Sequence, residues 1–178
     1  MNFDEYLNQF YICDSHLHIC DLLKNELNLI NNKNYFCCSS SHTKEDFLLQ
    51  TSILKNNSSN IIYSFGIHPF YQSVEELSFL ENLLEEKKIN AIGEIGLDYF
   101  SPELRAKREA QIKNFSIQIE LAIKYNLPIV IHARKSFNDI FNLSPKLKKV
   151  PSVIFHSYSG TFLEAMSIIN HGINAAFS

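Results

Sequence analysis

The sequence predicts an α/β fold of the TIM type, a (β/α) barrel in which each parallel strand is followed by a helix. Three observations support this prediction. Short apolar runs occur seven times along the 178 residues, separated by stretches with helical spacing, which is typical of βα units. Polar residues with metal-ligand chemistry close five of these runs. No G-x-G-x-x-G turn follows the first run, which disfavours an open nucleotide-binding sheet.

The apolar runs are the predicted strands, and they cover residues 10–13, 35–38, 61–65, 89–95, 128–131, 152–155 and 173–177. Cap residues and apolar stripes between them predict helices. Ser41 or Thr43 would cap a helix that reaches residue 53, and Ser73 with Glu76 resembles a capping box. The longest predicted helix covers residues 102–125, and another covers 161–169. We find no linker and no repeat, so residues 1–178 are predicted to form one domain.

Charge and cysteine content exclude several classes of protein. A net charge of -3 is unlike that of basic proteins that wrap nucleic acid, so a bound polyanion would be held locally by metal ions or a few cations. The four cysteines form no C-x-x-C zinc pattern, and we expect reduced thiols and a cytoplasmic location. We find no signal peptide and no apolar run near the ~18 residues of a membrane span, so no membrane partner is expected.

Histidines, carboxylates and one arginine close five of the predicted strands. They are His16 and His18 on the first strand, His68 on the third, Glu94 and Asp98 on the fourth, His132 and Arg134 on the fifth, and His156 on the sixth. In a parallel barrel every strand presents its C-terminal residue at the same mouth, so we expect these side chains to converge there. His42 and His171 fall outside the predicted strand ends, and we expect both on the surface.

Imidazole and carboxylate ligands suit zinc, manganese or another divalent ion, and magnesium is a third candidate. The predicted ligands form two sets that share one residue. His16, His18 and Glu94 would hold one ion, while Glu94, His132 and His156 would hold the second. Glu94 is the natural bridge, because a carboxylate has two oxygens. Two such ions would polarise a phosphoryl oxygen and lower the pKa of bound water.

Several of the remaining residues have more than one interpretation. Asp98 could hydrogen-bond an imidazole, contact metal-bound water or cap the next helix, and we count it with Glu94 and Arg134 as catalytic. His68 precedes a proline, and three roles are open to it: forming a turn, hydrogen-bonding substrate, or binding metal. Arg134 suits a bidentate phosphate contact, although a salt bridge is the alternative. Asp14 is expected to orient a ligand histidine.

These residues lie in motifs that resemble a known family. The motifs are Asp14-Ser15-His16-Leu17-His18, Gly66-Ile67-His68-Pro69, Gly93-Glu94-Ile95-Gly96-Leu97-Asp98, His132-Ala133-Arg134 and His156-Ser157-Tyr158-Ser159-Gly160. In this order and spacing they resemble the TatD-related metal-dependent deoxyribonucleases of the amidohydrolase superfamily. The resemblance implies a TIM-like barrel, a two-metal site and hydrolysis of phosphodiester bonds in DNA. It also implies that His16, His18, Glu94, His132 and His156 are the metal ligands.

One departure from the family pattern concerns the C-terminal part. The family ends with an eighth strand that carries a metal-binding aspartate, whereas this sequence reaches Ser178 in the predicted seventh strand. We therefore expect an incomplete barrel of about seven strands, with edges that favour self-association. Two alternatives to a deoxyribonuclease stay open: a non-catalytic remnant that binds metal or oligomerises, and an amidohydrolase that cleaves a C–N or ester bond in a small metabolite.

Overall fold

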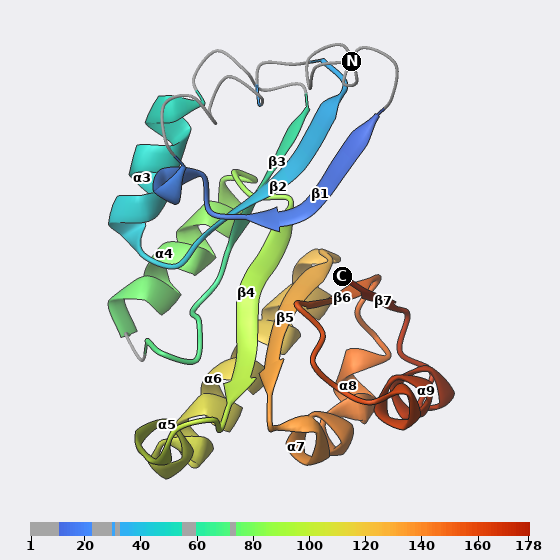
Figure 1. Cartoon of the computed structure of the whole chain (residues 1–178). Helices are drawn as coiled ribbons and strands as arrows, with labels where there is room; N and C mark the ends of the chain where they lie inside the picture. The colour runs from blue at the N-terminus through green and yellow to red at the C-terminus, as the bar shows by residue number, and fades with distance from the viewer. Residues whose placement is uncertain (1–10, 23–29, 31–32, 55–59, 72–73) are drawn as a thin grey trace.

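A computed structural model describes residues 11–22, 30, 33–54, 60–71 and 74–178 of the chain. The predicted strand start at Phe10 and the predicted cap at Ser73 lie outside these residues. Within them, seven parallel strands form one sheet in the order of the sequence. The strands are β1 (Ile12–Leu17), β2 (Tyr35–Ser41), β3 (Ile61–Phe65), β4 (Ala91–Asp98), β5 (Ile129–Arg134), β6 (Val153–His156) and β7 (Ala175–Phe177). The sheet curls into part of a barrel with helices on its outer face, which confirms the predicted fold class (Figure 1).

The described helices follow the strands in the expected alternation. They are the 3-10 turn η1 (Ile19–Asp21), α3 (Lys44–Ile53), α4 (Val74–Glu85), α5 (Pro102–Ala106), α6 (Arg108–Tyr125), α7 (Phe137–Asn142), α8 (Ser144–Leu147) and α9 (Phe162–Asn170). Of the two candidate caps for α3, Thr43 is the one used, since its side chain accepts a hydrogen bond from the Asp46 N–H at 3.1 Å. No helix in the described ranges has the length and apolar character needed to cross a bilayer.

The predicted helix over residues 102–125 is two helices rather than one. Ser101 caps α5 by accepting a hydrogen bond from the Leu104 N–H at 3.2 Å, and the chain leaves helical geometry at Lys107 before α6 begins. Asn126 ends α6 in the left-handed conformation, with φ of 53°. The apolar stripe that predicted one helix belongs to α6, and it carries no signal for the break at Lys107.

Strand β2 extends three residues beyond its apolar run, and this affects what lies at the mouth. Ser39 and Ser41 are buried although polar, because Gln50 of α3 pairs with both. The Ser39 hydroxyl donates to Gln50 Oε1 at 2.7 Å, and Gln50 Nε2 donates to Ser41 Oγ at 3.1 Å. A buried polar group costs little when its hydrogen bonds are satisfied. The strand therefore continues to Ser41, directly before His42.

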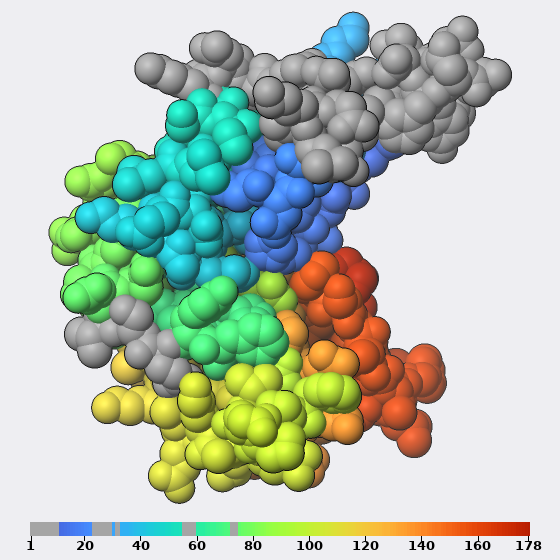
Figure 2. Space-filling model, turned by 60° about the vertical axis from the view of Figure 1, so that its left-hand side comes forward, coloured from blue at the N-terminus to red at the C-terminus, as the bar shows by residue number. Residues whose placement is uncertain are grey.

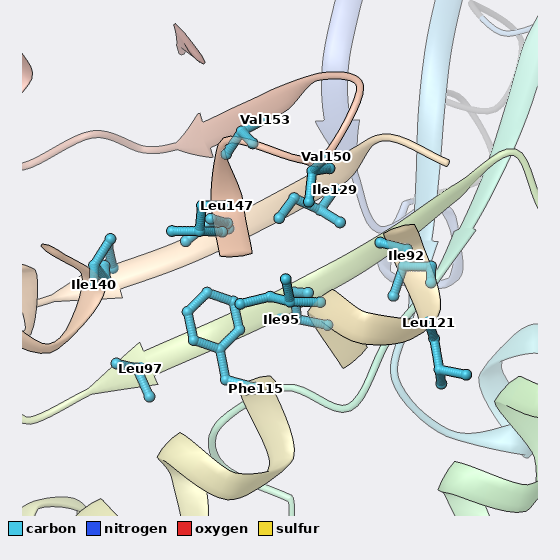
Figure 3. Close-up of a cluster of buried hydrophobic side chains, with 14 of the residues drawn as sticks. Ile92, Ile95, Leu97, Phe115, Leu121, Ile129, Ile140, Leu147, Val150 and Val153 are labelled. Carbon is cyan, nitrogen blue, oxygen red and sulfur yellow. The ribbon is translucent and has the colours of Figure 1, made fainter. Parts of the chain in front are cut away.

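The main core lies between the sheet and α6. Phe115, Ile119 and Ala122 form one face of that helix, and each is at most 1% exposed. Phe115 lies beside Ile95 in the cluster drawn in Figure 3, which joins residues of β4, β5 and the outer helices. Because this packing holds α6 against β4 along its length, polar side chains on the same helix face can reach the backbone at the ends of the strands.

Candidate metal centre

Six of the seven histidines surround one carboxylate at the C-terminal ends of the strands. Three groups place one ligand atom per residue within 4.8 Å of one another: His16, Glu94 and His156; His18, His42 and Glu94; His68, Glu94 and His132. Glu94 belongs to all three groups. The structure thus brings together every histidine that the sequence assigned to the mouth, and it adds His42.

The curl of the sheet closes this cluster. His16 lies on the edge strand β1 and His156 ends β6, yet their ring centroids are only 3.9 Å apart. In Figure 2 the blue residues of β1 border the orange and red residues of the C-terminal segment. Strands β1 and β6 therefore approach each other across the mouth, which a flat sheet of the same strand order would not allow.

Glu94 is 4% exposed, and each of its carboxylate oxygens faces different imidazoles. Oε2 lies 3.2 Å from His16 Nε2, 3.9 Å from His18 Nε2 and 4.0 Å from His42 Nε2. Oε1 lies 3.0 Å from His132 Nδ1. Burial alone would raise the pKa of Glu94, but the His132 and His16 rings beside it hold that pKa well below its usual range. A buried anion is therefore fixed at the centre of the cluster.

Burial favours the neutral form of three of the surrounding imidazoles. Burial lowers the pKa of His42 to about 4 and that of His68 to about 3. It also lowers the pKa of His156, and the neighbouring His16 ring adds to the effect. Neutral imidazole has one nitrogen with a free lone pair, which is the form that binds a metal ion.

Backbone carbonyls fix which nitrogen carries the proton on two of these rings. His18 Nδ1 lies 3.1 Å from the Ser40 carbonyl, and His42 Nδ1 lies 3.4 Å from the Gly66 carbonyl. A carbonyl only accepts, so Nδ1 donates in both cases and the lone pair remains on Nε2, the nitrogen that faces Glu94. Such a contact on the outer nitrogen is how proteins orient metal-binding histidines.

His16 is held by β2 as well. Its Nδ1 lies 3.0 Å from the Ser40 hydroxyl, and its Nε2 lies 3.1 Å from His18 Nε2. Asp14, which we expected to orient a ligand histidine, instead accepts hydrogen bonds from the backbone N–H of His16 at 3.1 Å and from the Tyr35 hydroxyl at 3.2 Å. It fixes the backbone of β1 at His16 rather than the ring.

The neutral His68 ring is held in the opposite tautomer. Its Nδ1 accepts a hydrogen bond from the Phe70 N–H at 3.3 Å, so in the neutral ring Nε2 carries the proton. A side chain held in this way offers a donor to the mouth instead of a lone pair. This geometry fits the predicted role in substrate binding better than it fits a metal ligand.

His132 lies between two carboxylates. Nδ1 is 3.0 Å from Glu94 Oε1, and Nε2 is 2.8 Å from Asp98 Oδ2. Burial opposes protonation of this ring, but the two carboxylates outweigh it and raise the pKa of His132. Asp98 is 1% exposed, and its other oxygen accepts a hydrogen bond from the Phe100 N–H at 2.8 Å. Of the three interpretations of Asp98, the structure shows the contact to an imidazole, while Ser101 is the cap of the next helix.

Arg134 is the last residue of β5 and is exposed. Its guanidinium carbon lies 3.7 Å from the centroid of the Phe100 ring. In the described part of the chain its neighbour is therefore an aromatic ring, and not the carboxylate of the salt-bridge alternative. The fork of the guanidinium remains available to a ligand at the rim of the mouth.

The prediction that His42 lies on the surface is wrong. Its side chain is 14% exposed, and its ring centroid lies 4.9 Å from that of His18 and 5.0 Å from that of His68. The error follows from ending the second strand at residue 38, because His42 directly follows β2 as the other site residues close their strands. His171 is exposed and stacks on Phe141, so its predicted surface position is confirmed.

Two glutamines on α6 support the mouth, and sequence reasoning missed both. Gln111 Oε1 accepts from the Asp98 N–H at 2.8 Å, and its Nε2 donates to the Asp98 carbonyl at 3.0 Å. Gln118 makes the same pair of bonds to Ile67, at 2.8 and 3.1 Å. Each is 1% exposed. The available signal was the spacing of seven residues, which places two polar side chains on the apolar face of one helix.

The donor set of this site fits a divalent ion. A buried carboxylate and several neutral imidazoles with lone pairs directed inward are the ligands that zinc and related ions use in proteins. Among the residues that the structure describes, the partners of the buried Glu94 carboxylate are imidazoles, and burial of a charge without a stronger partner is costly. A metal ion held by this donor set would suit hydrolytic chemistry, with the His68 donor and the exposed Arg134 at the same end of the sheet.

Comparison with other proteins agrees with the fold, and metal-dependent hydrolases are among the relatives. The family model described as TatD related DNase matches residues 13–178. An uncharacterized metal-dependent hydrolase of Buchnera aphidicola subsp. Baizongia pistaciae is 29% identical over 94% of this chain and 67% of its own. The 3'-5' ssDNA/RNA exonuclease TatD of Escherichia coli K12 is 32% identical over 61% of this chain and 42% of its own.

A solved structure shows the same fold. The crystal structure of YJJV, a TatD homolog from Escherichia coli K12, covers 93% of this chain and 66% of that protein, with a TM-score of 0.78 at 23% identity. This chain thus spans about two thirds or less of the length of these relatives. Because the family model matches nearly all of its residues, the chain belongs to the TatD related DNase family.

Proposed function

We propose that this chain is a metal-dependent hydrolase that cleaves phosphodiester bonds in DNA with the help of two divalent ions. The observation that carries the proposal is the position of Glu94, a buried carboxylate common to three groups of converging ligand atoms. Family membership supports it, as do relatives named metal-dependent hydrolases and a nucleic-acid exonuclease.

The proposed ligands are those that the sequence predicted, with one addition. His16, His18 and Glu94 would hold one ion, and Glu94, His132 and His156 the other. His42 joins the first set as a candidate, since its Nε2 faces the same Glu94 oxygen as His18. The imidazole-rich set favours zinc or manganese over magnesium, which prefers oxygen ligands. When bound, two such ions polarise a phosphoryl oxygen and lower the pKa of water.

The chain's own residues would supply binding and orientation. His68 would donate from Nε2 to a phosphate oxygen, and Arg134 would contact a second phosphate through its guanidinium fork. Asp98 would act as a positioning residue, since it holds the outer nitrogen of His132 and leaves the inner one toward Glu94. Local contacts of this kind are needed because the chain as a whole is acidic.

Two further proposals concern the environment of the protein. The strands β1 and β7 form the edges of the described sheet, and we expect them to support self-association, since unpaired strand edges bind other strands. A cytoplasmic location is proposed from the interpretation of the cysteines as reduced thiols.

The test is cleavage of single- and double-stranded DNA during titration with Mn²⁺, Zn²⁺ or Mg²⁺. We expect metal-dependent hydrolysis that Glu94→Gln abolishes, while Glu81→Gln, the same change at an exposed position of α4, keeps it. Absence of cleavage with every ion would contradict the proposal. Cleavage of a panel of cyclic amides in place of DNA would replace it with the amidohydrolase alternative.

A further inference from the structure

Three half-exposed aromatic side chains rim the metal centre. Phe70 and Tyr71 follow β3 and are 49% and 45% exposed, and Phe100 follows β4 and is 49% exposed. Single exposed apolar residues are common, but these three gather at the C-terminal ends of adjacent strands. The Phe70 ring lies 4.4 Å from the His68 ring and 6.1 Å from the His132 ring. They are therefore part of the mouth and not scattered over the surface.

The Phe100 ring makes cation–π contacts with two basic side chains. The Arg134 guanidinium lies 3.7 Å and the Lys135 ammonium 4.8 Å from its centroid, both within the range of a cation–π contact. The backbone N–H of Phe100 donates to Asp98, whose other oxygen contacts His132. The ring is thus tied through Asp98 to a proposed ligand of the metal centre, while about half of it stays open to solvent.

We propose that Phe100, assisted by Phe70, is a stacking platform for unpaired bases of the substrate strand. The inference rests on the proposed function and names the residues that would set its specificity. Proteins that bind single-stranded nucleic acid combine cations along the backbone with aromatic rings on which bases stack. Phe100 with Arg134 and Lys135 has this composition. In a duplex the bases are already stacked and paired, so their faces cannot reach the ring.

The test compares two single strands of equal length, one of thymidine nucleotides and one with the same backbone but abasic sugars throughout. The readout is the ratio of kcat/KM for the thymidine strand to kcat/KM for the abasic strand. We expect Phe100→Ala to lower this ratio at least about fivefold, as base–aromatic stacking energies imply. Phe100→Trp should keep the ratio, and Phe70→Ala should lower it. Tyr11→Ala serves as the control, since Tyr11 is 78% exposed and precedes β1 at the opposite end of the sheet.

A fall in kcat/KM by the same factor for both strands would overturn the platform, because it would show a role in folding or phosphate contact. An unchanged ratio in Phe100→Ala would overturn it as well. If the wild-type protein hydrolysed neither strand, the proposed function would fail. The stacking role of Phe100 would then be tested separately by measuring DNA binding. Fluorescence anisotropy in EDTA should then show tighter binding of the thymidine strand to wild type than to Phe100→Ala, and equal affinities would overturn the inference.

Discussion

Replacing Asp98 by asparagine is expected to weaken metal binding while leaving the fold intact, because it changes which nitrogen of His132 carries the proton. Asp98 Oδ2 and Glu94 Oε1 both only accept, so without metal the His132 ring donates from Nε2 at 2.8 Å and from Nδ1 at 3.0 Å. When the Nδ1 proton gives way to a metal ion, Asp98 keeps the remaining proton on Nε2 and leaves the lone pair on Nδ1. This is the nitrogen that the proposed ligand set requires.

The asparagine has one favourable orientation. Its oxygen must still accept the Phe100 N–H, now bonded to Asp98 at 2.8 Å, because the flipped amide would place two donors against each other. The amide N–H group therefore faces His132 Nε2 and moves the ring proton to Nδ1. Loss of such an outer contact lowers metal affinity by about 10- to 100-fold, or about 1.4–2.8 kcal/mol. Asp98 is 1% exposed, so water cannot reach the site to replace the lost acceptor.

The assay is a competition titration of Mn²⁺ or Zn²⁺ against a chelator, with thermal unfolding in EDTA to show that the variant folds. Asp139→Asn is the matched control, since Asp139 is also buried but pairs with Tyr99 and Arg108 and not with the histidine cluster. Wild-type affinity in Asp98→Asn would refute the reasoning, and so would an equal loss in Asp139→Asn.

Two other predictions concern stability. Gln118→Leu should lower the free energy of unfolding by about 1–3 kcal/mol, because it leaves the buried backbone N–H and carbonyl of Ile67 without the Gln118 side chain as their partner. Urea titration measures this change. An unchanged free energy of unfolding would contradict the supporting role of this side chain. Burial would raise the pKa of Asp139, but the hydrogen bonds from Arg108 and Tyr99 outweigh it and lower that pKa. Because its pKa is lower in the folded state, ionised Asp139 stabilises the fold at pH values above its unfolded-state pKa of about 3.9. This stabilisation is lost as the pH falls through the folded-state pKa. The Tm of Asp139→Asn should therefore lie below that of wild type at pH 7, with a gap that narrows in acid; a constant gap would exclude the linkage.

The sequence was sufficient to predict the parallel strands and most of the mouth. The apolar runs mark the strands, and parallel strands place their C-terminal residues together, so His16, His18, Glu94, His132 and His156 could be grouped without coordinates. The structure also brings His16 beside His156, because the sheet curls. Curl is a property of the whole sheet and leaves no local pattern in the sequence.

The residues that sequence reasoning missed depend on long-range polar contacts. His42 was excluded because the serines before it do not look like a buried strand, and they are buried only because Gln50 satisfies them. Gln111 and Gln118 bond to backbone groups of strand ends far away in the sequence. A polar residue on an apolar helix face shows that a partner is needed, but it does not show which one.

The stoichiometry of bound metal tests the central claim most directly, since Glu94 is proposed to belong to both ligand sets. Elemental analysis of the purified protein after equilibration with Zn²⁺ or Mn²⁺ should give two ions per chain for wild type. Glu94→Gln should lose both ions together, whereas Glu81→Gln should retain them. A single ion in wild type, or two ions in Glu94→Gln, would contradict the proposal that this carboxylate is the common ligand of a two-metal centre.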